Sequence, residues 1–160
     1  MLAKSAVVIP YPTMPKASKG VLGDKHTKYM NVLSKIASDI TFPVRKNARM
    51  SACIVYKNDI VSFGVNEMKS HPFQAKYGKN EDAIYPHAET SAIRNALKYI
   101  STEELEKSTL YVCRVKFDDS FKRKLIFGLS KPCPGCKRCI STFGIKNVVY
   151  SMDNCGYQIL

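Results

Sequence analysis

The sequence has no run of about 18 apolar residues, the length that a helix needs to span a membrane, so we expect no membrane-spanning segment. It also lacks a Walker-type glycine loop and the glycine fingerprint of dinucleotide-binding domains, which argues against both of those nucleotide sites. The apolar stretch near the N-terminus is interrupted at Pro10, Pro12 and Pro15 and is shorter than the core of a signal peptide. We therefore expect no targeting signal and a cytoplasmic location.

Acidic residues are scarce. The chain has 13 Asp and Glu against 25 Lys and Arg, which gives a formal net charge of +12. Such a surplus attracts polyanions, and these include both nucleic acids and small phosphorylated substrates. Charge alone therefore does not decide between these two classes of partner.

The chain contains six cysteines, whose chemical role has to be assigned. Six cysteines would allow three disulfides in a secreted protein. Without a signal peptide, and with Cys-x-x-Cys spacing, metal binding in a reducing compartment is the favoured interpretation. The six are Cys53, Cys113, Cys133, Cys136, Cys139 and Cys155.

Length and hydrophobicity indicate one folded domain. The chain has 160 residues, of which 45% are hydrophobic, enough for a proper core. Residues 1–23 are rich in Pro, Gly and Lys and are expected to form an extended N-terminal arm. Residues 24–160 are expected to form a single domain.

Hydrophobic periodicity predicts the order of helices and strands. An α/β fold follows, with helices on both faces of a mixed, mostly parallel sheet, because strands joined through helices usually run parallel. A hairpin supplies one antiparallel edge, and residues 67–85 are expected to be a long loop. The predicted helices are 25–40, 87–100 and 134–143; the predicted strands are 50–56, 60–63, 109–115 and 147–151, with short additional strands at 125–127 and 157–160.

Two short motifs carry the chemistry. They are Pro-His-Ala-Glu at 86–89 and Pro-Cys-Pro-Gly-Cys at 132–136, and each is predicted to open a helix. Together they match the pattern His-x-Glu followed by Pro-Cys-x-x-Cys. The sequence thus resembles the zinc-dependent cytidine and deoxycytidylate deaminase superfamily over roughly residues 25–151. The resemblance implies a three-layer α/β/α sandwich, a Zn²⁺ cofactor and a homo-oligomer.

The resemblance also assigns residues to roles. His87, Cys133 and Cys136 would bind a catalytic zinc, which keeps three protein ligands and one open position for water. Glu89 would be the catalytic residue that carries protons between that water and the base. Ala88, whose amide and small side chain would meet the pyrimidine, and Asn66, which would hold the sugar, are the expected substrate contacts.

Other interpretations of the same residues remain open. Cys139 could join His87 and the Cys-x-x-Cys pair in a closed, structural zinc site, although a packed thiol is favoured for it. Asn66 could simply end a strand in a turn. A second zinc held by His71 or His26 with a cysteine is conceivable, but no spacing requires it.

The favoured function is deamination of a free cytosine nucleotide, dCMP or a related deoxycytidine nucleotide. The Pro-Cys-Pro-x-Cys motif and the segment 143–150 look most like deoxycytidylate deaminases. The alternative is a nucleic-acid deaminase acting on single-stranded DNA or tRNA, which the net charge and the arm favour. Tryptophan is absent, although single-stranded DNA deaminases typically carry one just before the cysteine motif. A binding protein on a deaminase scaffold is a third possibility, and the complete set of motif residues argues against it.

Overall fold

The computed structural model describes residues 9–15, 24–41, 49–78, 85–120, 124–153 and 156–160. The elements in chain order are α1 (Asp24–Ser38), β1 (Arg49–Tyr56), β2 (Asp59–Val65), α2 (Pro72–Tyr77), α3 (Ala88–Ala96), α4 (Thr102–Glu106), β3 (Thr109–Phe117), β4 (Leu125–Gly128), α5 (Pro134–Thr142), β5 (Asn147–Ser151) and β6 (Tyr157–Ile159). None of the helices in this part of the chain is long and apolar enough to cross a membrane.

The strands form one mixed sheet in the order β2-β1-β3-β5-β6, and β4 pairs with the C-terminal half of β3. Within the described residues, only β3 and β5 pair in parallel, and the pairings of β1 with β2, β1 with β3, β3 with β4 and β5 with β6 are antiparallel. The α/β class is confirmed, but the prediction of a mostly parallel sheet is wrong.

The error has a geometric cause. Strands β2 and β3 are joined through helices and do run in the same direction, as the crossover rule requires. However, they are not neighbours, because β1 lies between them and is antiparallel to both. A helical connection indicates that two strands run in the same direction, but it does not indicate that they pair with each other.

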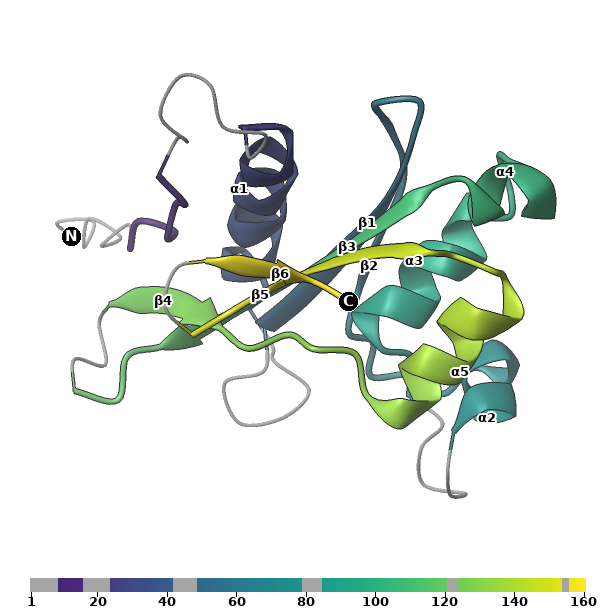
Figure 1. The fold of residues 1–160 in the computed structure, drawn as a ribbon. Helices are drawn as coiled ribbons and strands as arrows, with labels where there is room; N and C mark the ends of the chain where they lie inside the picture. The colour runs from purple at the N-terminus through teal and green to yellow at the C-terminus, as the bar shows by residue number, and fades with distance from the viewer. Residues whose placement is uncertain (1–8, 16–23, 42–48, 79–84, 121–123, 154–155) are drawn as a thin grey trace, which may run out of the picture.

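Helices cover both faces of this sheet, as predicted. Figure 1 shows α1 on one side of the sheet and α2, α3, α4 and α5 gathered on the other. Successive residues of a strand point to opposite faces, so β1 sends Ala52 and Ile54 into the core under α3, and Cys53 and Val55 into the core under α1. Both cores are apolar, which explains why the central strands read as continuous hydrophobic runs.

Two short helices were not predicted. The expected loop 67–85 contains α2, and α4 lies between α3 and β3. Neither helix is long enough to show a hydrophobic period. In α4 the sequence did carry a local signal, because Ser101 and Glu104 form a capping box in which each side chain accepts a hydrogen bond from the other residue's backbone N–H.

The expected arm at 1–23 is described only at residues 9–15, which contain neither helix nor strand. This stretch lies along α1. Asn31 accepts a hydrogen bond from the backbone N–H of Met14 at 2.7 Å, and the Ser34 hydroxyl donates to the carbonyl of Pro12 at 2.5 Å. The remainder of the arm lies outside the described residues, and the division into arm and domain stays a prediction.

Candidate metal centre

His87 and Cys133 occupy equivalent positions on two different helices. His87 is the N-cap of α3 and Cys133 is the N-cap of α5, with Pro134 in the first turn. Both motifs therefore open helices, as the sequence predicted. The backbone N–H groups in a first helical turn have no partner within the helix, so each of these positions favours negative charge.

The two helix starts face each other and bring three metal-binding side chains together. The ligand atoms of His87, Cys133 and Cys136 all lie within 4.8 Å of one another. His87 Nδ1 is 3.5 Å from the sulfur of Cys133 and 3.3 Å from the sulfur of Cys136. Tetrahedral zinc with ordinary Zn–N and Zn–S bonds would separate such atoms by about 3.6 Å. The cluster therefore fits Zn²⁺, and three ligands leave a fourth position open.

The two thiols of the Cys-x-x-Cys pair differ in acidity. A hydrogen bond from the side chain of Cys136 is the first cause that lowers the pKa of the Cys133 thiol to about 3, and hydrogen bonds from His87 and from the backbone N–H of Cys136 also contribute. The same bond, together with burial, raises the pKa of Cys136. One sulfur of the pair is thus held as a thiolate, the form in which cysteine binds metals.

The closed four-ligand alternative is not formed by the described residues. Cys139 lies one helical turn beyond Cys136, is fully buried and packs in the apolar core with Ile140, outside the metal-binding group. The two other histidines have different partners: His71 caps α2 by accepting from the backbone N–H of Phe73, and His26 is hydrogen-bonded to the hydroxyl of Tyr111. A second His and Cys group is therefore absent from the described residues, and Cys155 lies outside them.

Glu89 lies in the first turn of α3, beside the metal-binding cluster. Its side chain is 2% exposed, and its Oε2 has no hydrogen-bond partner among the described residues. Burial raises the pKa of this carboxyl group, while the charge of His87 acts in the opposite direction. A buried carboxyl group with a free oxygen beside a metal-binding cluster can accept and return a proton at neutral pH.

Asn66 and Ala88 lie close to the same helix start. The backbone N–H of Glu67 donates to the carbonyl of Pro86, and the Glu67 carboxylate accepts from Ser91 and from Arg94, at 2.9 Å for Arg94. These contacts attach the turn that carries Asn66 to α3. Asn66 Oδ1 is buried and has no hydrogen-bond partner in the described structure, so it is available to a ligand.

Sequence reasoning did not single out the residue that contacts His87 from α2. Gln74 is 2% exposed, and its Oε1 accepts from the backbone N–H of His87 and from the hydroxyl of Thr90. No pattern in the sequence links residue 74 with residues 87 and 90, because the contact arises only in the folded chain.

Tyr157 packs against His26 on the α1 side of the sheet, with ring centroids 5.3 Å apart, so it is away from the cluster. Lys69, Lys76 and Lys124 are exposed. Three further basic residues, Lys79, Lys122 and Arg123, lie outside the described residues.

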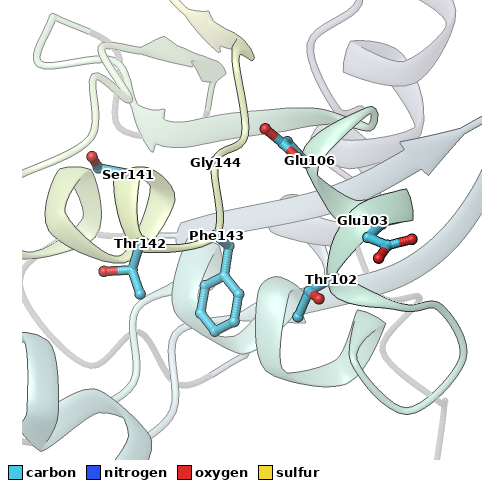
Figure 2. A pocket seen from close by; sticks show the side chains of 7 residues that line it. All are labelled: Thr102, Glu103, Glu106, Ser141, Thr142, Phe143 and Gly144. Carbon is cyan, nitrogen blue, oxygen red and sulfur yellow. The ribbon is translucent and has the colours of Figure 1, made fainter.

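A hollow of about 460 Å³ lies between the start of α4 and the end of α5, as Figure 2 shows. Its lining includes Glu103, Glu106 and Phe143. Cys133 and the metal-binding cluster are at the opposite end of α5. This hollow therefore contains none of the predicted site residues, and the chemistry of the donor atoms is the better guide to the active site.

Comparison with known proteins gives two kinds of match. The family model for the cytidine and deoxycytidylate deaminase zinc-binding region matches residues 24–152. Among solved structures, the dCMP deaminase of the cyanophage S-TIM5 in apo form is 22% identical and has a TM-score of 0.53, covering 81% of this chain and 83% of that one. Its complex with dCMP and dUMP is also 22% identical, with a TM-score of 0.51 and coverage of 78% and 79%. At this identity the likeness shows a shared fold. No curated protein matches the chain.

Proposed function

We propose, from the premise that this chain belongs to the cytidine and deoxycytidylate deaminase family, that it hydrolyses the amino group of a cytosine nucleotide to give the uracil form and ammonia. The observation that carries the proposal is the group of His87, Cys133 and Cys136 with the buried, unpartnered Oε2 of Glu89 beside it. The proposed substrate is dCMP or a related deoxycytidine nucleotide.

His87, Cys133 and Cys136 would hold the zinc ion, which, when bound, lowers the pKa of a water molecule so that it can attack at neutral pH. Glu89 Oε2 takes a proton from the attacking water and delivers it to N3 of the base. The oxygen of the water forms a bond to C4 of the cytosine. Glu89 then takes the remaining proton from the hydroxyl group added at C4 and passes it to the leaving amine. The C4–N bond breaks as the C4=O bond forms, and ammonia departs.

Ala88 and Asn66 orient the base and the sugar in this proposal. Ala88 is fully buried at the start of α3, and its methyl side chain leaves room for the pyrimidine ring to approach the metal ligands. The free Oδ1 of Asn66 is a hydrogen-bond acceptor, which suits a sugar hydroxyl group as donor.

Support for a free nucleotide substrate comes from two directions. The S-TIM5 enzyme, which shares the fold, is a dCMP deaminase that binds dCMP and dUMP. The net charge of +12 favours a substrate that carries phosphate. The same charge supports the second candidate, a deaminase of single-stranded DNA or tRNA, and the comparison of substrates below separates the two.

We also propose a cytoplasmic location and a homo-oligomeric state. The five described cysteines are free thiols, which fits a reducing compartment such as the cytoplasm. By analogy with its family, we expect the protein to act as a homo-oligomer.

The test is ammonia release by the zinc-loaded protein with dCMP, dCTP, deoxycytidine and a cytosine-containing single strand in parallel, with Glu89→Ala as the control. Turnover of dCMP or dCTP that is lost in the control is the expected result. Activity on the oligonucleotide alone would replace the proposal by the nucleic-acid function. No activity on any substrate, with zinc bound, would favour a binding protein.

A further inference from the structure

Helix α2 lies against the two helices that carry the metal ligands, and it contacts both. It comes from the segment between β2 and α3 that the sequence indicated as a loop, and the proposed mechanism gives it no role. Figure 1 shows it beside α5 and near the start of α3, at the edge of the helical layer. Its contacts with each of the two helices are specific.

Toward α3, the contact is polar and buried. Gln74 Oε1 lies 3.2 Å from the backbone nitrogen of His87 and 2.5 Å from Thr90 Oγ1, and it accepts a hydrogen bond from each. The hydroxyl of Thr90 in turn lies 3.2 Å from the nitrogen of His87 and 3.0 Å from its carbonyl oxygen. Gln74 is 2% exposed and Thr90 is 1% exposed, so water does not compete for these bonds.

Toward α5, helix α2 makes one hydrogen bond between a carbonyl and a guanidinium group and one stacking contact between two aromatic rings. Arg138 donates from Nη2 to the carbonyl of Tyr77 at the end of α2. A Cβ atom at Gly135 would lie 3.0 Å from that same carbonyl oxygen, which is tighter than an ordinary contact, so the glycine allows the first turn of α5 to lie close to the end of α2. The rings of Phe73 and Phe143 are stacked with centroids 6.0 Å apart.

We propose that Gln74 on α2 is the positioning residue for His87, because it holds the start of α3 in the place that zinc binding requires. The inference rests on the proposed zinc centre. His87 is an N-cap, so its backbone N–H has no backbone acceptor within the helix and donates to two side chains, those of Thr90 and Gln74. Gln74 is the acceptor that comes from another helix, so it ties the backbone from which the imidazole projects to α2.

The physical expectation follows from the donors that Gln74 satisfies. Replacing Gln74 by Met keeps the length of the side chain and removes the acceptor. The N–H of His87 and the hydroxyl of Thr90 then lose the acceptor on α2 and keep only their contacts with each other, so the start of α3 is held less firmly. Outer groups that orient a metal ligand typically change metal affinity by about 10- to 100-fold when they are removed.

The experiment measures the zinc dissociation constant by competition with a chromophoric chelator, for the full chain and for Gln74→Met, Thr90→Val and Phe73→Leu. Phe73→Leu is the matched control, because it loosens the packing of α2 on α5 and leaves Gln74 in place. The spectrum of bound Co²⁺ reports the geometry of the ligands independently of activity. Circular dichroism and the melting temperature report folding.

The expected result is a loss of zinc affinity of about 10-fold or more in Gln74→Met, with an altered Co²⁺ spectrum. Phe73→Leu should lower the melting temperature and keep the affinity and spectrum of the unchanged chain. Equal losses of affinity in the two variants, or none in Gln74→Met, would overturn the proposal, because α2 would then act through packing alone or not at all.

If Gln74→Met does not fold, Thr90→Val decides. It is isosteric and removes the hydroxyl that donates to Gln74 and accepts from the N–H of His87, so affinity should fall about 3- to 10-fold, the equivalent of one hydrogen bond. Unchanged affinity would mean that the polar contact between α2 and the start of α3 does not position His87, and it would overturn the proposal. Failure of the proposed function is distinguishable, because the unchanged chain would then fail to bind zinc or would bind it without releasing ammonia from any substrate.

Discussion

A Cβ atom at Gly64 on β2 would lie 2.3 Å from the carbonyl oxygen of Ala88 in the first turn of α3. It would lie equally close to the backbone nitrogen of Ala92. Strand and helix therefore pack backbone to backbone at this point, and the Ser62 hydroxyl strengthens the contact by donating to the carbonyl of Ala92. This contact sets how far the start of α3, and with it His87, stands above the sheet.

Gly64→Ala should force α3 away from β2, because backbone atoms cannot rotate out of the way as a side chain can. We expect the free energy of unfolding to fall by about 1–3 kcal/mol. Gly128→Ala is the matched control, since its Cβ would meet only the side chain of Arg114, at 3.0 Å. Denaturant unfolding of both variants gives the comparison, and a Gly64 variant no less stable than the Gly128 variant would contradict the expectation.

Asn66→Ala should separate stability from substrate binding. The Oδ1 of Asn66 is buried without a hydrogen-bond partner in the described structure, so removing it relieves a desolvation cost in the ligand-free protein. We expect unchanged or slightly higher stability together with a KM for the nucleotide that rises about tenfold, the equivalent of one buried hydrogen bond to the sugar. Thermal unfolding and steady-state ammonia release measure the two effects.

The result that would count against a sugar contact for Asn66 is a stability loss with an unchanged KM. The amide would then serve the turn at the end of β2, which is the alternative that the sequence left open.

Glu89→Gln keeps the shape of a buried side chain and removes its ability to carry a proton. If Glu89 transfers protons to the base and the leaving amine, kcat should fall about 10²- to 10⁴-fold. The zinc content should stay the same, because Glu89 is not a member of the metal-binding group. Ammonia release and metal analysis of the same preparation make the test, and a variant that keeps most of its kcat would remove Glu89 from the mechanism.

Cys136 and Cys139 lie on the same helix and can be compared directly by replacing each with alanine. Both are fully buried on α5, three residues apart, but only Cys136 belongs to the metal-binding group. Cys136→Ala should abolish retention of zinc through dialysis, whereas Cys139→Ala should keep zinc and lose about 1 kcal/mol of stability from the smaller side chain. Zinc retention by the Cys136 variant together with loss by the Cys139 variant would reverse the assignment of ligands.

Local sequence signals were enough to predict the helix starts that bring His87, Cys133 and Cys136 together. His87 and Cys133 are helix N-caps, and the residues that determine a cap lie within four positions of it. The two faces of the sheet were also predictable, because helical and strand periods are local properties. The sequence could not show that β1 separates β2 from β3, since strand order depends on contacts between residues far apart in the chain.

The missing part of the site has the same explanation. Gln74 contacts His87 and Thr90 across 13 and 16 positions. Six residues of α2 contain too little of a helical period to be recognised, and a buried glutamine looks like a surface residue in a sequence. The roles of Asn66 and Ala88 rest on resemblance, and they stay predictions until a nucleotide is bound.

The sequence distance between the ligands has a consequence for how the protein responds to chelators. His87 and Cys133 are 46 positions apart, on helices that depend on the sheet to different degrees. Helix α3 is held to β2 by the Gly64 contact and by Ser62. The polar contacts of α5 with other described elements are made to helices, by Arg138 to α2 and by Cys133 and Cys136 to His87. Removal of zinc should therefore speed amide hydrogen exchange in α5 and α2 first, while β1 and β3 keep their protection. Bound zinc would then stabilise the packing of α5 and α2, whereas the sheet would stay folded without the metal.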